Sequence, residues 1–158
     1  MTNSSRSTDR IRPRAPEPSH ERTIRETPTG EEVAGLGLGE RNVVVAELAT
    51  LQRDGDVAVV VIDNPPVNAG SIEVRRGLLA AVREIDADPS IVGAVLIGAG
   101  TTFIAGSDIR EFGGPIEDPQ LPAVIAAIET SPTVFVAAIH GAALGGGFEL
   151  ALGCDARV

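Results

Sequence analysis

The 158-residue chain is 43% apolar, which is enough for one core of ordinary size and predicts one domain or part of one. A formal net charge of −9, four Phe and no Trp or Tyr argue against a nucleic-acid partner. The sequence contains no run of about 18 apolar residues, and no secretory or organellar signal is recognisable. We therefore predict a soluble, cytoplasmic protein with no membrane partner.

The first 42 residues differ in composition from the rest of the chain. They are rich in Arg, Pro and Ser, and their seven Arg balance seven acidic residues, so the net charge resides on residues 43–158. They carry too few apolar side chains to offset the entropy lost on ordering. We predict a disordered leader over residues 1–42 and a folded domain over residues 43–158.

Two strands followed by a helix are expected to begin the domain. Residues 43–48 and 57–63 are β-branched runs, and an Asp-Gly turn signal separates them. The prolines of "DNPPVN" end the second run, because proline has no N–H for a strand ladder. Ser71 is a candidate N-cap for a helix over residues 71–88, whose apolar side chains recur at helical spacing: Val74, Leu78, Val82 and Ile85.

The remaining segments continue an alternation of strands and helices. The order predicted is a strand, a helix, a strand, a helix and the start of a further strand, over residues 91–98, 118–132, 133–141, 145–155 and 156–158. Such an alternation indicates right-handed βαβ units and a largely parallel sheet covered by helices. Because the last strand is cut short, we expect the chain to be a fragment of a longer domain.

Two glycine-rich loops follow predicted strands, at residues 98–112 ("GAGTTFIAGSDIREF") and 140–149 ("HGAALGGGFE"). Ligand sites of α/β proteins lie at the carboxyl ends of parallel strands. Each loop leads to a helix start, where unpaired N–H groups favour negative charge. Two N–H groups directed at one oxygen would form an oxyanion hole, and phosphate binding is the competing use of the same geometry.

Three motifs in the same chain carry a family resemblance. "NPPVNA" (64–69), "IAGSDIREF" (104–112) and "AAIHGAALGGGFELALGCDARV" (137–158) resemble, in this order, those of the crotonase or enoyl-CoA hydratase/isomerase superfamily. The residues of these motifs are most similar to those of the hydratase portion of bacterial fatty-acid oxidation multifunctional proteins. The resemblance covers the N-terminal half of the family's domain. It implies an α/β fold of the crotonase-like β-β-α spiral (ClpP/crotonase) type, truncated at the C-terminus.

The resemblance also implies a site and a substrate. In the family, two amides bind the thioester oxygen of an acyl-CoA substrate, and the matching positions are Ala105 and Gly146. Glu149 matches the catalytic general acid/base, and the CoA and substrate site matches Ala105, Gly106, Ser107, Asp108 and Gly146. The implied role is enolate stabilisation in fatty-acid β-oxidation. Coenzyme A is part of the substrate, so neither a metal nor a separate cofactor is expected.

The chain also departs from the family pattern. The family's second carboxylate and its trimer-forming C-terminal helices lie beyond Val158, and no loop acid (Asp108, Glu111 or Asp118) is obliged to replace that carboxylate. Gly70 stands where the family usually carries Leu. We expect weak or absent hydratase activity from these 158 residues, so the enzyme class, hydratase (lyase) or isomerase, is implied by family only. The alternative is an inactive remnant or an interaction module.

Several residues have competing interpretations. The apolar neighbours of Glu149 (Phe148, Leu150 and Leu152) predict buried surroundings, Cys154 is expected to be a small buried hydrophobe, and His140 is expected to be structural. Ser107, His140 and Asp108 could form a serine-hydrolase triad, although no G-x-S-x-G motif is present. A nucleotide site is disfavoured, because Phe103 occupies the place of the third glycine in G-x-G-x-x-G.

Overall fold

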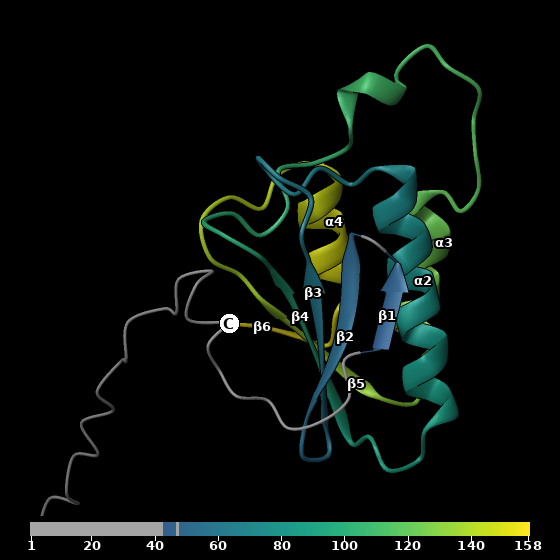
Figure 1. The fold of residues 1–158 in the computed structure, drawn as a ribbon, viewed down its shortest axis with the longest axis vertical. Helices are drawn as coiled ribbons and strands as arrows, with labels where there is room; N and C mark the ends of the chain where they lie inside the picture. The colour runs from purple at the N-terminus through teal and green to yellow at the C-terminus, as the bar shows by residue number, and fades with distance from the viewer. Residues whose placement is uncertain (1–42, 47) are drawn as a thin grey trace, which may run out of the picture.

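The computed structural model describes residues 43–46 and 48–158, so the predicted leader lies outside the described residues. Figure 1 shows a sheet with helices packed against it. The six strands are β1 (Val43–Ala46), β2 (Ala49–Asp54), β3 (Val57–Ile62), β4 (Gly93–Gly98), β5 (Val134–Ala138) and β6 (Ala156–Arg157). The helices are α2 (Ile72–Ala87), α3 (Leu121–Thr130), α4 (Gly146–Gly153) and the 3-10 helix η1 (Ile109–Glu111).

The strands lie side by side in the order in which they occur in the chain. β1, β2 and β3 pair antiparallel, whereas β3 to β6 pair parallel and are joined through α2, α3 and α4. Because the order never reverses and βαβ crossovers are right-handed, the three helices cover the same face of the sheet. Alternating burial in β4 and β5 agrees with a sheet that is fully covered on one face. The predicted α/β class with parallel βαβ units is confirmed.

The N-terminal strands differ from the prediction. The sequence indicated two strands over residues 43–48 and 57–63, but the structure contains the additional strand β2, which pairs with both neighbours. The Asp-Gly turn is present at Gly55, whose φ is +63°. The extra strand was missed because Gln52, Arg53 and Asp54 are polar and read as part of the turn.

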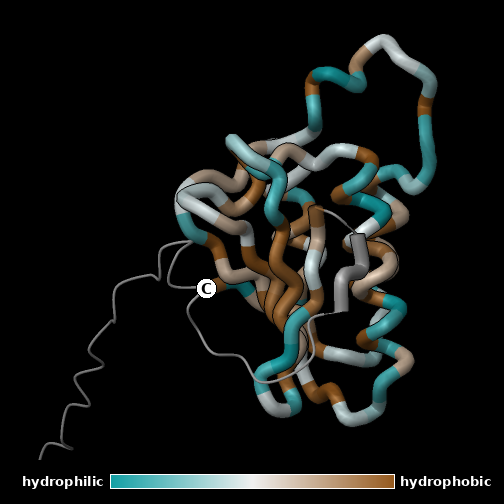
Figure 2. The backbone as a smooth tube through the Cα atoms, viewed as in Figure 1, coloured by the Kyte–Doolittle hydropathy of each residue, from teal (hydrophilic) through white to brown (hydrophobic). Residues whose placement is uncertain are grey.

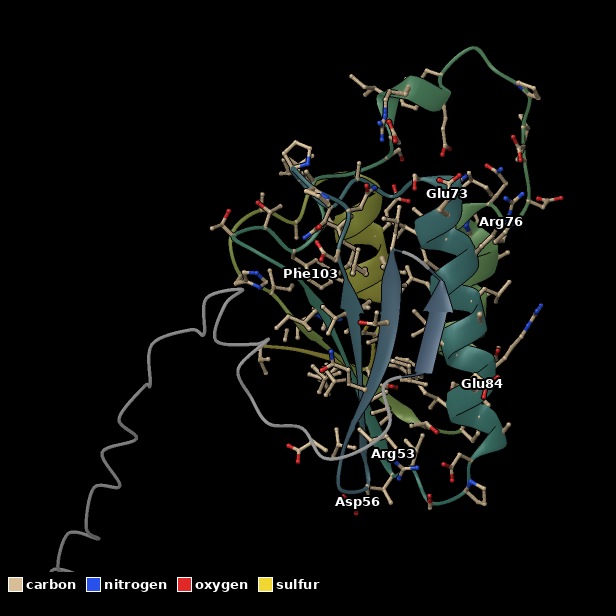
Figure 3. All side chains as sticks on the ribbon, in the orientation of Figure 1. Arg53, Asp56, Glu73, Arg76, Glu84 and Phe103 are labelled. Carbon is tan, nitrogen blue, oxygen red and sulfur yellow. The ribbon has the colours of Figure 1, made fainter. Side chains whose placement is uncertain are left out.

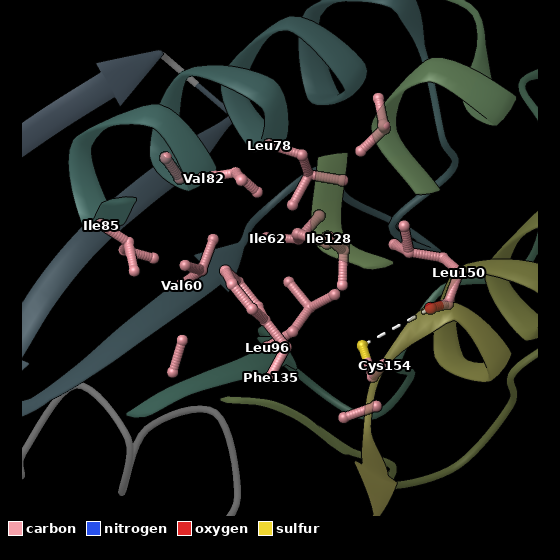
Figure 4. Close-up of a cluster of buried hydrophobic side chains, with 14 of the residues drawn as sticks. Val60, Ile62, Leu78, Val82, Ile85, Leu96, Ile128, Phe135, Leu150 and Cys154 are labelled. Atoms are coloured by element: carbon pink, nitrogen blue, oxygen red, sulfur yellow. Dashed lines mark hydrogen bonds between the residues drawn. The ribbon is translucent and has the colours of Figure 1, made fainter. Parts of the chain in front are cut away.

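The core lies between the sheet and its helices. In Figure 4, the α2 side chains Leu78, Val82 and Ile85 face Val60 and Ile62 of β3, and all five are buried. These α2 side chains belong to the predicted apolar stripe, which is confirmed. In Figure 2 the backbone of β3 is brown, and therefore hydrophobic, over most of its length. Burying such side chains stabilises the fold by about 1.5–3 kcal/mol each.

Both ends of α2 agree with the prediction. Ser71 is the N-cap residue, and its side-chain oxygen accepts a hydrogen bond from the Val74 amide at 3.4 Å. This cap fixes where the chain turns from β3 into α2, and the site described below forms beside that turn. Along residues 43–46 and 48–158, none of the helices has the length and apolar content needed to cross a bilayer.

Candidate functional site

Three connections meet where β3, β4 and β5 end. The segment Phe103–Ser107 lies between the turn that precedes α2 and the loop that precedes α4. On the α4 side, the Phe103 amide donates to His140 at 2.9 Å and the Leu144 amide donates to Ile104 at 3.1 Å. Phe103 is fully buried and fixes the start of the segment (Figure 3).

The opposite side of the same segment is also hydrogen-bonded through its backbone. The Ala105 amide donates to the carbonyl of Val67 at 3.1 Å, and the Gly70 amide donates to the carbonyl of Gly106 at 2.8 Å. Residues 103–107 therefore form the middle of a small three-segment layer above the main sheet. Because hydrogen bonds hold the segment on both sides, its backbone is fixed relative to the turn before α2 and the loop before α4.

Asn68 ties the turn before α2 to the loop after β4. Its buried side-chain amide donates to the carbonyls of Ala99 at 2.8 Å and Thr102 at 2.7 Å, while its oxygen accepts from the Asn64 amide at 2.9 Å. Its φ of +52° is in the left-handed region, which Asn tolerates better than most residues. This role of Asn68 was not predicted from the sequence. An Asn within a Pro-rich turn is the sequence feature that could have indicated it.

Each of the three consecutive glycines at the start of α4 is required for a different structural reason. Gly145 has a φ of +47°, which favours glycine. A Cβ on Gly147 would lie 2.3 Å from the carbonyl oxygen of Ile104, so a larger residue would push α4 away from the Phe103–Ser107 segment. A Cβ on Gly146 would lie 3.3 Å from Ser107 Oγ and 3.9 Å from Ser107 N. Glycine thus brings the start of α4 against the first loop.

The backbone amides of Ser107 and Gly146 lie at this junction, one on each loop. The carbonyl of Gly106 accepts from Gly70, and the carbonyl of Gly145 accepts from two α4 amides. In a trans peptide the N–H points away from the C=O, so both following amides face away from these bonds. Within the described part of the chain, neither amide has a protein acceptor.

The predicted donor Ala105 is a different case. Its amide already donates to Val67, as described above, so it serves the scaffold and is not available to a ligand. This hydrogen bond counts against the predicted role of the Ala105 amide, and it depends on how the segment pairs with the turn before α2. The two amides closest to the predicted arrangement are those of Ser107 and Gly146.

Two cavities flank the first loop. The larger, of about 570 Å³, lies between the start of α2, the loop of residues 109–120 and the start of α4, and Gly146 is part of its lining. The smaller, of about 420 Å³, lies on the other side, against Pro65 and Pro66, and includes Ala105. Gly106, Ser107 and Asp108 line both cavities. The structure thus places all predicted binding residues around one loop.

Glu149 lies on the first turn of α4, but its surroundings differ from the prediction. Leu150 is buried, whereas Phe148 and Leu152 are 50% and 54% exposed and Glu149 itself is exposed. The helical repeat explains this, because Gly147, Leu150 and Ala151 face the core and the residues between them face outward. Glu149 is outside the lining of both cavities.

Asp108 is a buried structural carboxylate. It caps η1 by accepting from the Arg110 amide at 2.9 Å, and it forms two-pronged hydrogen bonds with the Arg110 guanidinium. The Arg110 side chain and amide lower the pKa of Asp108, and Asp108 in turn raises the pKa of Arg110. Asp108 therefore stays ionised and engaged, and an engaged carboxylate is a poor base.

The other two loop acids have different surroundings. Glu111 is partly buried and forms an ion pair with Arg75 at 2.9 Å, whereas Asp118 is exposed. The described residues contain no cluster of three or more His, Cys, Asp and Glu side chains arranged to hold a metal ion.

The residues of the alternative serine-hydrolase triad, Ser107, His140 and Asp108, are not hydrogen-bonded to one another. His140 Nε2 lies 3.0 Å from the carbonyl oxygen of Gly100, and the Asp108 carboxylate is held by Arg110. A hydrolase triad requires His to contact both other members. Cys154 is 4% exposed, and burial raises the pKa of its thiol to about 11, which agrees with the predicted small buried hydrophobe.

A mixed sheet whose parallel strands end in two glycine-rich loops with adjacent amides defines a crotonase-like α/β protein. The family model for enoyl-CoA hydratase/isomerase matches residues 52–158. The chain therefore belongs to the enoyl-CoA hydratase/isomerase family, as its motifs predicted.

Individual relatives agree with this membership. The chain is 45% identical over 102 residues to the peroxisomal bifunctional enzyme of Danio rerio. This match covers 65% of the present chain and 14% of that enzyme. It is 40% identical over 116 residues to a probable enoyl-CoA hydratase of Bacillus subtilis, covering 69% of this chain and 45% of the relative. The chain thus spans less than half the length of each.

A solved structure supports the same fold. The enoyl-CoA hydratase/carnithine racemase of Magnetospirillum magneticum superposes with a TM-score of 0.65 at 34% identity. The match covers 75% of this chain and 49% of that structure. The predicted crotonase-like fold is confirmed.

Proposed function

We propose that this chain binds acyl-CoA thioesters and stabilises an enolate, with the thioester oxygen accepting hydrogen bonds from the amides of Ser107 and Gly146. The observation that carries the proposal is the pair of available amides on two different loops, with Ser107 N 3.9 Å from the Cβ position of Gly146. Family membership supports the substrate class.

The two cavities suggest how such a substrate would lie. Gly106, Ser107 and Asp108 line both, so a thioester bound at Ser107 would have one cavity on each side of its carbonyl. We assign the acyl chain to the larger cavity, whose lining includes Ile72, Val74 and Leu150. The CoA portion then lies along the smaller cavity, and Arg110, which lines both cavities, is a cation that favours phosphate.

The proposed chemistry is the addition of water to a 2-enoyl thioester. A water oxygen bonds to the β-carbon and gives one proton to a general base, while the electrons of the double bond move toward the thioester oxygen. The thioester carbonyl re-forms as the α-carbon takes a proton. Because negative charge develops on that oxygen, the two amides stabilise the transition state more than the substrate.

We assign the proton transfer to Glu149, which is three residues after Gly146 on the first turn of α4. Its carboxylate is exposed, so it can exchange protons with solvent and contact a substrate held at the Gly146 amide. General acid/base catalysis by one positioned carboxylate contributes about 10²–10⁴-fold in rate.

Calorimetric titration with butyryl-CoA, an unreactive saturated thioester, tests the binding part of the proposal. Binding of butyryl-CoA in preference to both free CoA and inorganic phosphate is expected. Equal binding of the three would indicate a phosphate site and contradict a thioester site.

Hydration of crotonyl-CoA, followed by loss of the enoyl-thioester absorbance, tests the catalytic part. Glu149→Gln should lower the rate by about 10²-fold or more while leaving butyryl-CoA affinity within about twofold. A folded chain that binds butyryl-CoA without turnover would reduce the proposal to thioester binding, which is the interaction-module alternative.

A further inference from the structure

Arg75 is a charged side chain within the buried side of α2. It is 7% exposed and reaches three separate segments: Nε donates to the carbonyl of Pro119 at 2.8 Å, and Nη1 donates to the carbonyl of Gly70 at 2.8 Å and to Glu111 Oε2 at 2.9 Å. One guanidinium thus joins the turn before α2, η1 and the end of the outer loop. Arg75 also lines the larger cavity that these segments enclose.

Glu111 completes this connection. Its second oxygen, Oε1, accepts from the Ile72 amide at 2.6 Å, so the carboxylate binds both the N-terminus of α2 and the Arg75 side chain. A carboxylate is stabilised at this helix end, where N–H groups are unpaired. The pair therefore fastens η1 to the first turn of α2.

The outer loop, residues 109–120, has little apolar anchoring. Ile109, Phe112 and Ile116 are 76%, 71% and 87% exposed. In Figure 1 this green segment projects beyond the ends of α2 and α3. An exposed ion pair between Arg76 and Glu117, at 3.1 Å, adds little, because such pairs contribute about 0–1 kcal/mol. The position of the loop thus depends mainly on Arg75 and Glu111.

Arg75 is also connected to the proposed oxyanion hole. Arg75 donates to the carbonyl of Gly70, and the Gly70 amide donates to the carbonyl of Gly106. The Gly106 carbonyl and the Ser107 N–H belong to the same planar peptide unit, so fixing one fixes the direction of the other.

We propose that Arg75 is a positioning residue that sets both the outer wall of the acyl cavity, through Glu111 and Pro119, and the direction of the Ser107 amide, through Gly70. This inference rests on the proposed thioester function. It predicts that the two effects can be separated, because the hydrogen bond from Arg75 to the Gly70 carbonyl does not involve Glu111.

The test compares four variants of the full chain by amide hydrogen exchange and by titration with butyryl-CoA. Arg75→Met should raise exchange in residues 109–120 and at Gly70, whose amide donates to Gly106, and should weaken butyryl-CoA binding about 10- to 100-fold, because hydrogen bonds from a charged donor are lost. Arg75→Lys should recover part of that loss, since it keeps the charge but cannot reach three acceptors in a fork.

Two further variants separate positioning from general loosening. Glu111→Gln should raise exchange in residues 109–120 but leave the Gly70 amide protected as in the wild type. Arg76→Met is the matched control, because it removes a neighbouring arginine of the same helix whose ion pair is exposed. Its binding and exchange should stay within about twofold of the wild type.

The outcomes distinguish failure of the inference from failure of the function. If the wild type does not bind butyryl-CoA, the thioester function fails, whatever the variants do. If the wild type binds and Arg75→Met matches Arg76→Met in affinity and exchange, the positioning role is overturned. If Arg75→Met is unfolded by circular dichroism, Arg75→Lys and Glu111→Gln decide: loss of protection at the Gly70 amide in both variants or in neither overturns the proposal.

Discussion

The connection between β4 and α3 has two parts that are held in different ways. The inner part, Phe103–Ser107, is fixed on both sides by backbone hydrogen bonds, and glycines allow α4 to approach it. The outer part, residues 109–120, is held by side chains of α2, while its own apolar side chains are exposed. Backbone pairing therefore determines where the amides lie, and two charged side chains determine how the cavity is closed.

The largest effect should follow from removing the amide that α4 places beside the inner part. Gly146→Pro deletes the N–H at the first position of α4, where proline is well tolerated, whereas Gly146→Ala keeps the N–H and adds a similar Cβ. If the chain turns over crotonyl-CoA, proline should lower the rate about 10²–10³-fold relative to alanine, which is the usual cost of losing an oxyanion donor. Equal rates for the two variants would show that this amide is not used.

The second effect concerns the approach of α4 to the inner part. Gly147→Ala places a Cβ 2.3 Å from the backbone oxygen of Ile104, so we expect a loss of about 1–3 kcal/mol in the free energy of unfolding. Gly93→Ala is the control, because its Cβ would have an ordinary contact of 3.8 Å. Urea denaturation measures both, and equal stability of the two variants would contradict the close packing described here.

These comparisons also show what the sequence could predict. The β-branched runs and the apolar stripe of α2 predicted the parallel part of the fold, and the glycine-rich motifs located both loops. Which amide of the first loop is left without an acceptor could not be predicted, because that depends on pairing with Val67 and Gly70, which are far away in the sequence. Arg75 was overlooked because a charged residue next to an apolar stripe usually faces solvent.

A third prediction tests the junction of the two parts, where Asp108 caps η1. Because Arg110 lowers the pKa of Asp108, its contribution to stability should be fully present above the ordinary value of 3.8 and lost as the pH falls through the lower folded-state value. Urea denaturation at a series of acidic pH values should show this loss. In Asp108→Asn that part of the pH dependence should be absent, and an unchanged profile would exclude the assigned role of Asp108.

The smallest effect is expected for an exposed contact of the outer part. Glu117→Gln removes the charge opposite Arg76, and both side chains are more than half exposed. Denaturation should detect a change of at most about 1 kcal/mol, which high salt should diminish. A larger loss would mean that the outer loop is held by more than Arg75 and Glu111.

The most direct test of the central claim is a ¹H–¹⁵N correlation spectrum of the chain during titration with butyryl-CoA. We expect the amide protons of Ser107 and Gly146 to move downfield together as they donate to the thioester oxygen, while that of Ala105, bonded to Val67, moves little. Saturable binding in which the Ser107 and Gly146 signals remain unshifted would show that these amides do not bind the thioester.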